Sequence, residues 1–442
     1  MAGDRKRGAW AEIFASRRMA IVAALGFASG LPLLLTGQVL ALWLTDAKID
    51  IKTIALFASV GLPYTLKFTW AWILDAVVPP FLGRRRGWML ITQVGLIAAI
   101  AVLGSTDPAS NTSFVAYMAI IVAALSATQD VAIDAWRAEI LDPEERAAGS
   151  AVYVLGYRVA MLAVGTAGLI LADFTSYRVV FLGTAGLLAL CIVATFLAEE
   201  PATARARPRD LAAAVVEPLF EPIVEFFRRL GWAALIALGF AALYKFGDQM
   251  VDGLIGPFWR RELVLSKTEI GTITKFAGFA GVAVGGLLAG ILTPRLGSRR
   301  ALILFGVLQA ATNFLYVALT ITGKSYPLIV GAIFVDYVAN TMGTAVFMAV
   351  FIAMCNKQFT AAQYALLTSL SSVGKRVFGW VGGDIIAGAG WAAFFCSTAA
   401  MAIPGILLVL VLPRSLLEPP KKPGENPRDL PDADDVQGTS RP

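Results

Sequence analysis

The chain alternates long apolar stretches with short polar or charged connections. A membrane-spanning helix needs about 20 consecutive, mostly apolar residues. Twelve stretches of this kind are centred near residues 30, 64, 96, 126, 159, 187, 243, 280, 309, 338, 374 and 402. The pattern therefore predicts an all-α membrane protein with twelve transmembrane helices.

The connection between the sixth and seventh predicted helices differs from the others in composition. It is rich in proline and arginine, which is typical of a linker, and part of it is predicted to lie as an amphipathic segment on the membrane surface. We therefore expect a six-helix half over residues 1–198, a linker over 199–230 and a second six-helix half over 231–413. Residues 414–442 are proline-rich and charged, and we expect them to form a disordered tail.

Lysine and arginine are distributed unevenly between the two sides of the predicted bundle. With the N-terminus inside, the cytoplasmic segments hold 24 of them and the opposite side holds 7. Cytoplasmic loops carry an excess of these residues in membrane proteins. Both termini, the linker and the tail are therefore predicted to be cytoplasmic.

Charged residues inside the apolar stretches are the strongest functional signal. Each one costs about 3 kcal/mol or more near the bilayer centre, so it normally faces the bundle interior or a wet cavity. The acids are Asp130, Asp134, Asp248, Asp252, Asp336 and Asp384, and the bases are Lys67, Arg158, Lys245, Lys275, Lys375 and Arg376. So many charges over several helices predict a polar pathway through the membrane, and hence a transporter.

The fourth predicted helix carries its polar residues on one stripe. Ser126, Asp130, Asp134 and Arg137 recur at intervals of about one helical turn, with Gln129 beside them. A carboxyl group in a low-dielectric cavity holds its proton more tightly than in water. Asp130, or Asp134, is therefore predicted to couple transport to protons; an internal salt bridge between helices is the alternative.

Other polar residues in the spans are candidates for binding the substrate. Lys245, Asp248, Gln249 and Asp252 share one face of the seventh helix. Arg158 and Arg376 lie near the middles of helices five and eleven, where they suit an anionic ligand or pairing with Asp130 and Asp336. The substrate-binding candidates are Tyr64, Lys67, Gln129, Arg158, Lys245, Asp248, Gln249, Asp252, Asp336, Lys375 and Arg376.

Composition narrows the chemistry further. The chain has no histidine, and its three cysteines show no paired spacing. We therefore predict no metal, no cofactor and no membrane enzyme. Basic residues are scattered in short loops, so no nucleic acid is expected as a partner. The predicted partners are the lipid bilayer, protons and an anionic solute, and a monomer suffices.

The two halves resemble each other. Residues 83–86 (GRRR) recur 214 positions later as 297–300 (GSRR). Duplicated halves with a basic loop after each second helix resemble the major facilitator superfamily, whose substrate site lies near the midplane between the halves. In that superfamily an acid at the end of helix two and the basic loop form a charge latch. The resemblance implies a gating role for Asp75, Arg84, Arg85 and Arg86.

A narrower resemblance rests on several short motifs. They are residues 30–32 (GLP), 79–88 (PPFLGRRRGW), 127–130 (ATQD), 134–136 (DAW), 143–146 (PEER) and 155–158 (LGYR). Together they resemble the AmpG muropeptide permease family of Gram-negative bacteria, most specifically over the first 200 residues or so. Gly30, Gln129 and Asp130 are the positions that the family motif marks as functional, and Gly30 joins the substrate-binding candidates on this ground. Ala76 departs from the family, which often has arginine there.

The resemblance implies a function. It implies proton-driven import, across the inner membrane, of GlcNAc-anhydroMurNAc peptides released by cell-wall turnover, and a link to β-lactamase induction. Two alternatives keep the fold, namely transport of another anionic conjugate such as an acyl-CoA and drug efflux. A non-transporting sensor is a further alternative.

Overall fold

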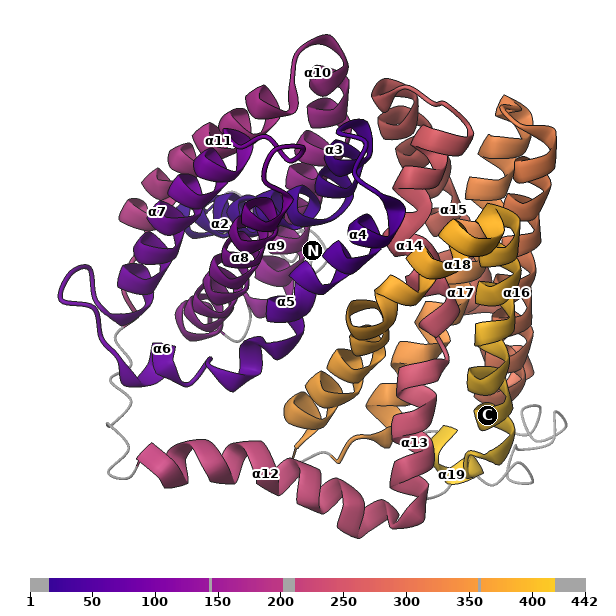
Figure 1. Ribbon diagram of the computed structural model, residues 1–442. Coiled ribbons are helices and arrows are strands. Elements are labelled where there is room, and N and C mark those ends of the chain that lie inside the picture. The colour runs from indigo at the N-terminus through magenta and orange to yellow at the C-terminus, as the bar shows by residue number, and fades with distance from the viewer. Residues whose placement is uncertain (1–15, 143–144, 202–210, 357–358, 418–442) are drawn as a thin grey trace, which may run out of the picture.

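The structure is a computed structural model, and it describes residues 16–142, 145–201, 211–356 and 359–417. All regular elements of these residues are helical. Figure 1 shows two groups of helices side by side, with the helix α12 (Leu211–Leu230) running along the lower edge from one to the other. The all-helical fold that the apolar pattern predicts is confirmed.

The first group begins with two broken stretches. The first comprises α2 (Arg17–Leu34), the π-helical segment η1 (Leu35–Val39) and α3 (Leu40–Asp46). The second comprises α4 (Ile51–Leu56), η2 (Phe57–Gly61), α5 (Leu62–Leu66), η3 (Lys67–Thr69) and α6 (Ile73–Ala76). The group continues with α7 (Arg84–Gly104), α8 (Thr112–Ile140), α9 (Arg146–Leu162), η4 (Ala163–Ala167), α10 (Gly168–Phe174) and α11 (Tyr177–Leu197).

The second group follows α12. It comprises α13 (Trp232–Leu243), α14 (Phe246–Pro257), η5 (Phe258–Glu262), α15 (Lys267–Leu296), α16 (Ser298–Thr322), α17 (Tyr326–Met354), α18 (Thr360–Val411) and α19 (Arg414–Leu417). The tail predicted over 414–442 thus begins with one short helix, and its residues 418–442 lie outside the described residues.

Ten helical stretches of the described residues are long and apolar enough to cross a membrane. Two features account for the difference from the predicted twelve. The segment from α4 to α6 is divided into short pieces, none of which is long enough alone. The helix α18 contains Gly390 at φ 80°, ψ 177°, a conformation that only glycine adopts readily, so its apolar run is two helices joined at a bend.

The breaks in the segment from α4 to α6 follow from its residues. The Asp50 carboxylate caps the start of α4 by accepting a hydrogen bond of 2.9 Å from the backbone N–H of Thr53. Pro63 lacks an N–H group and lies in the first turn of α5, where a new helical piece can begin. Lys67 follows this piece directly, so the irregular backbone carries a charged residue.

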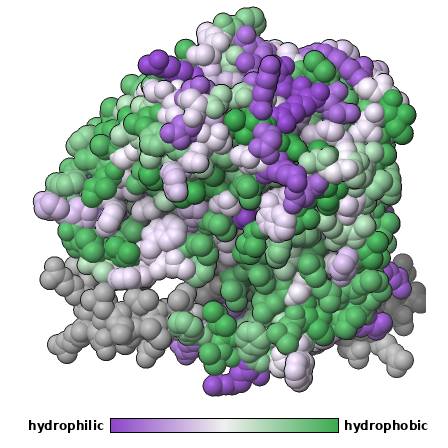
Figure 2. Space-filling view, in the orientation of Figure 1, coloured by the Kyte–Doolittle hydropathy of each residue, from purple (hydrophilic) through white to green (hydrophobic). Residues whose placement is uncertain are grey.

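The outer surface is apolar, as a lipid environment requires. Large side chains such as Leu190, Phe276 and Leu287 are strongly exposed, whereas Gln129 and Lys245 are buried. Figure 2 shows apolar residues over the flanks of both groups and polar residues gathered at the upper end. The chain therefore has the apolar surface of a membrane protein, with polar residues such as Gln129 and Lys245 in its interior.

The two groups touch mainly at one end. There η4 and α10 contact α15, α3 and α4 contact α14, and α4, η2 and α5 contact α18. We call this the closed end; it is the upper end of the molecule in Figure 1. The helices α6 and α12 and the start of α7 lie at the opposite end, which is the lower end in Figure 1.

The helix α12 is fixed to the second group by hydrogen bonds. The Arg229 guanidinium donates to the carbonyl oxygen of Met354 (2.8 Å), and the Gln363 amide donates to that of Pro222 (2.9 Å). Burial alone would raise the pKa of Glu225, but hydrogen bonds from Asn356 and Gln363 and the charge of Arg229 outweigh it and lower that pKa. The linker therefore ends as an ordered helix.

Candidate functional site

The stripe of polar residues on α8 faces the broken segment of the first group. The Asp130 carboxylate lies 4.0 Å from the Lys67 ammonium, and the Asp134 carboxylate lies 3.1 Å from the Arg137 guanidinium. The Asp130 side chain is only 13% exposed, whereas those of Lys67 and Asp134 are 34% and 47% exposed. The stripe thus runs from a nearly enclosed carboxylate to one that is open to solvent.

Several polar atoms around Asp130 have no hydrogen-bond partner within the described residues. They are one Asp130 carboxylate oxygen, the hydroxyl groups of Ser29, Tyr64 and Ser126, and both polar atoms of the Gln129 amide. Buried polar groups are nearly always hydrogen-bonded, to protein or to water. We call these residues, with Lys67 and Asp134, the α8 site. The α8 site is therefore a polar region whose buried hydrogen-bonding groups are only partly matched within the described residues.

Aromatic side chains border the α8 site. The Arg137 guanidinium lies over the Tyr153 ring at 4.1 Å, and the Trp70 indole donates a hydrogen bond of 3.1 Å to the Thr128 hydroxyl. Tyr153 comes from α9 and Trp70 from the turn before α6. The site therefore combines charge with flat apolar surfaces, a combination that suits a ligand with sugar rings.

Two basic residues of the second group, Arg376 and Lys275, lie beside glycines of the first group. The Arg376 guanidinium lies 5.9 Å from the centre of the Tyr64 ring, and a Cβ added to Gly61 would be 3.2 Å from its Nε. A Cβ on Gly165 would likewise be 3.3 Å from the Lys275 ammonium. The Nη1 of Arg376 has no partner within the described residues. Both bases thus lie where the two groups meet.

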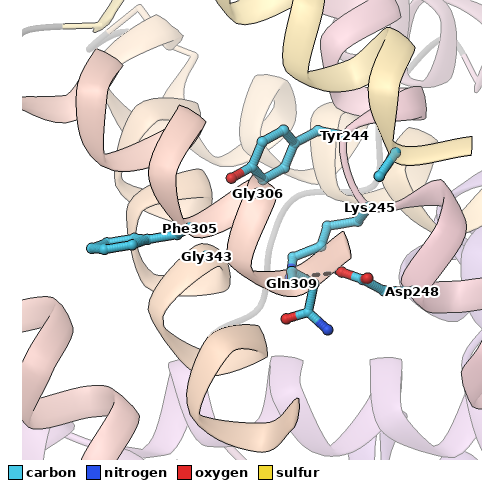
Figure 3. A pocket seen from close by; sticks show the side chains of 8 residues that line it. Tyr244, Lys245, Asp248, Phe305, Gly306, Gln309 and Gly343 are labelled. Carbon is cyan, nitrogen blue, oxygen red and sulfur yellow. Dashed lines mark hydrogen bonds and ion pairs between the residues drawn. The ribbon is translucent and has the colours of Figure 1, made fainter. Parts of the chain in front are cut away.

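The charged residues of α14 lie in a more enclosed setting. The Lys245 ammonium donates to Asp248 (3.1 Å) and to the Asn340 carbonyl oxygen (3.4 Å), and both charged side chains are 10% exposed or less. They line a cavity of about 10 Å³, close to the size of one water molecule, together with Gln309 (Figure 3). A sugar does not fit there in this conformation.

Asp336 is also satisfied within the second group. It accepts hydrogen bonds from the Gln309 amide (3.0 Å), the Thr312 hydroxyl (2.7 Å) and the Tyr316 hydroxyl (3.0 Å). These donors come from α16 and Asp336 from α17, so the carboxylate joins two helices. Among the described residues, neither Arg158 nor Arg376 forms an ion pair with Asp336, although both were expected as possible partners.

The remaining candidates are dispersed. The Gln249 amide donates to the Ser371 carbonyl oxygen at 2.6 Å. Asp252 is exposed on α14, and Arg158 is exposed on α9 beside Leu155 and Val159. The side chain of Lys375 lies outside the described residues. The partner of Asp130 is Lys67 and not Arg158, because the polar face of α8 turns toward η3.

Gly30 allows two helices to approach closely. A Cβ at this position would be 2.5 Å from the backbone oxygen of Tyr157 on α9, and one at Gly26 would be 2.4 Å from that of Tyr153. Gly156 on α9 meets the backbone oxygen of Ala23 in the same way, at 2.2 Å. Small residues at such spacing let membrane helices pack backbone to backbone. Gly30 therefore positions α9, and with it Tyr153, beside the α8 site.

The predicted gating residues form a cluster inside the first group. The Arg85 guanidinium is paired with Asp75 (2.7 Å) and Glu139 (2.5 Å), and Arg84 with Glu139 (3.5 Å). The backbone N–H groups of Arg85 and Arg86 donate to Glu200 (2.8 and 3.0 Å). These contacts tie together the ends of α6, α7, α8 and the chain after α11.

Sequence reasoning missed several members of these clusters. Glu139 and Glu200 lie next to loops, where acidic residues are common, so nothing distinguished them. Ser29 is a small polar residue in an apolar helix, and only its position beside α8 gives it importance. Asp46, Arg260 and Lys267 at the closed end were also missed, because only the folded structure brings them together.

Ion pairs inside each group of membrane helices, together with bases that lie where the two groups meet, are the features of a membrane transporter. Residues 48–247 and 238–437 match the Major Facilitator Superfamily, and the chain belongs to this superfamily and, within it, to the family that includes the anhydromuropeptide permease of Escherichia coli K12. It is 42% identical to that permease over 405 residues, which are 91% of this chain and 81% of the permease. The expectation of a transporter rather than an enzyme is confirmed.

Solved structures support the same fold. A POT family transporter in complex with 5-aminolevulinic acid superimposes with a TM-score of 0.70 at 11% identity, covering 91% of this chain and 97% of the other. A D-xylose–proton symporter does so with a TM-score of 0.66 at 14% identity, covering 91% and 98%. At these identities the likeness concerns the fold alone.

The close approach at Gly30 can be tested by adding one methyl group. We expect Gly30→Ala to lower the free energy of unfolding by about 1–3 kcal/mol, because the backbones of α2 and α9 must separate. The measurement is the thermal melting temperature of the purified protein in detergent. Gly37→Ala is the control, since nothing lies within 4 Å of its added Cβ. Equal melting temperatures for the two variants would contradict the packing role.

Proposed function

We propose that this chain is a proton-coupled importer of anhydro-muropeptides, carrying GlcNAc-anhydroMurNAc peptides from the periplasm to the cytoplasm for cell-wall recycling. The main support is its 42% identity, over 91% of its length, to the anhydromuropeptide permease of Escherichia coli. The α8 site adds support from the residues, since it offers charge, hydroxyl groups and aromatic rings to a glycopeptide.

The proposal includes a topology in the bacterial inner membrane. Residues 51–76 form the second span in broken form, and the bend at Gly390 separates the eleventh from the twelfth. Twelve spans then divide into halves over 1–198 and 231–413, with both termini and the 199–230 linker in the cytoplasm. The excess of lysine and arginine supports this orientation. The closed end then faces the periplasm, and the structure is inward-facing.

Proton coupling is assigned to Asp130, with Asp134 further along the same stripe. Ionised Asp130 attracts the Lys67 ammonium, which lies 4.0 Å away. Protonation of Asp130 removes its charge, and Lys67 becomes available to a carboxylate of the substrate. A proton and an anionic substrate therefore bind together from the acidic periplasm, and both leave on the cytoplasmic side, where the pH is higher.

Substrate carboxylates are assigned to bases from both halves. Lys67 belongs to the first half. Lys275 and Arg376 belong to the second half and lie beside Gly165 and Gly61 of the first. A guanidinium binds a carboxylate through two parallel hydrogen bonds, which favours Arg376 as the main anchor. A ligand that binds residues of both halves favours the arrangement of the halves in which both sets of contacts form, so its binding can drive their relative movement.

The enclosed clusters have supporting roles in this proposal. Lys245, Asp248 and Asp336 hold α14, α16 and α17 together, and rearrangement of these helices would be needed before the substrate reaches them. Asp75, Arg84, Arg85 and Arg86 brace the cytoplasmic ends of the first half. A monomer is sufficient, because the site lies between two halves of one chain.

The function is tested by uptake of radiolabelled GlcNAc-anhydroMurNAc-tripeptide into proteoliposomes with an inward proton gradient. We expect concentrative uptake that an uncoupler abolishes. Unlabelled acyl-CoA and common efflux substrates serve as competitors, and they should not reduce the uptake. No uptake by protein shown to be folded, or uptake that acyl-CoA suppresses, would refute the assignment of the substrate.

Asp130→Asn tests the proton coupling. The amide cannot exchange a proton, so we expect accumulation against a gradient to fall at least about tenfold while exchange of substrate between the two sides continues. Uptake and counterflow are measured in the same proteoliposomes. Asp142→Asn is the control, since its side chain is 74% exposed in a loop. Full accumulation by Asp130→Asn would exclude Asp130 as the proton carrier.

Arg376→Gln tests the anion site. Loss of charge-assisted hydrogen bonds costs about 1.5–3 kcal/mol, which corresponds to a rise in KM of roughly tenfold or more. Because the lost contact is to the carboxylate, we expect a much smaller rise for a substrate whose peptide carboxylates are amidated. Arg300→Gln, which changes an exposed residue in the first turn of α16, is the control and should not change KM. Equal effects on the native and amidated substrates would remove Arg376 from the site.

A further inference from the structure

An ion cluster bridges the two halves at the closed end. The Asp46 carboxylate, at the end of α3, accepts a hydrogen bond from the Arg260 Nε (2.6 Å) and lies 3.7 Å from the Lys267 ammonium. The Tyr177 hydroxyl donates to the same carboxylate at 2.9 Å. Asp46 and Tyr177 belong to the first half and both bases to the second, so one carboxylate joins the halves through two cations.

A second carboxylate holds the start of α15. Asp173 accepts hydrogen bonds from the backbone N–H groups of Lys267 (3.1 Å) and Thr268 (2.6 Å). The Lys267 ammonium also donates to the Ala172 carbonyl oxygen (2.5 Å), next to Asp173. These are the first N–H groups of a long helix, where a negative charge is favoured. The end of α10 thus caps a helix of the other half.

The internal repeat places a related ion pair on the opposite edge. Lys52 and Lys267 each lie in the first turn of a helix and are 215 residues apart, and Asp173 and Asp384 are 211 residues apart. Lys52 is paired with Asp384 at 2.7 Å, as Lys267 is with Asp173 at 3.9 Å. The two edges of the closed end therefore carry equivalent Lys–Asp contacts between the halves.

The two edges have different surroundings. The side chains of Lys52 and Asp384 are 58% and 45% exposed, whereas those of Lys267 and Asp46 are 13% and 21% exposed. On the Lys52 edge the helices also pack through glycine, since a Cβ on Gly383 would be 2.7 Å from that of Ala55. An exposed pair is screened by water and salt, and a partly buried cluster is screened much less.

We propose that the cluster of Asp46, Asp173, Tyr177, Arg260 and Lys267 is the latch that keeps this end shut, and that the exposed Lys52–Asp384 pair contributes little to closure. Opening this end requires Asp46 to part from Arg260 and Lys267. Both cations are then left facing the space between the halves, where they attract an anionic solute arriving at that end.

The test measures the distance between the halves at the closed end without any substrate, so it is independent of the proposed transport function. Spin labels are placed at Ser110 and Thr322, which are exposed near this end in the first and second halves, after Cys191, Cys355 and Cys396 are replaced. Double electron–electron resonance then gives the distance distribution in nanodiscs. The variants compared are Asp46→Asn, Arg260→Gln and, as the symmetry-matched control, Asp384→Asn.

We expect a short distance in the parent protein. Asp46→Asn and Arg260→Gln should each raise the long-distance population by about threefold or more, because closure loses its shared ion pair. Asp384→Asn should leave the distribution unchanged. Unchanged distributions in both latch variants, or an equal shift in Asp384→Asn, would overturn the proposal. Using two latch variants guards against misfolding of either one, which size-exclusion chromatography and melting temperature detect.

Discussion

The structure depends on the cost of a charged side chain inside a membrane. Each such group must be paired, hydrogen-bonded or in contact with water, because lipid offers no compensation. Three ion pairs among the described residues meet this requirement. Asp130 is paired with Lys67 in the first group, Lys245 with Asp248 in the second, and Asp46 with Arg260 between them. The arrangement of the helices therefore follows from which charges must meet.

An irregular stretch of backbone brings one of these charge pairs together. In hydrocarbon an irregular backbone is tolerated only where protein or water satisfies its polar groups. The segment from α4 to α6 is broken into short pieces and faces both α8 and α18, so its free backbone groups lie inside the bundle. The break places Tyr64 and Lys67 beside Asp130. A straight helix would not necessarily bring these side chains there. The irregularity and the charged site are thus two consequences of the same inward position.

The sequence predicts part of this organisation and not the rest. Apolar length predicts the helices, and the one-turn spacing of Asp130 and Asp134 predicts a polar stripe, because both signals lie within single helices. The partner of Asp130 depends on how two helices pack, and one sequence does not contain that information. Gly30 shows the same limit. The family motif marks it as functional, and only the packing of α2 against α9 reveals that a Cβ at this position would be 2.5 Å from the Tyr157 backbone oxygen.

The charge clusters within the two halves differ in their access to water. Lys245 and Asp248 are 10% exposed or less beside a cavity of water size, so their charges are matched within the protein and cannot exchange a ligand without movement of helices. Asp130 and Lys67 are partly exposed and keep unpartnered polar neighbours. A site that binds and releases both a proton and a solute needs polar groups whose hydrogen bonds and charges are not already matched within the protein. For this reason we propose the α8 site, rather than the better-paired cluster of the second half, as the site of transport.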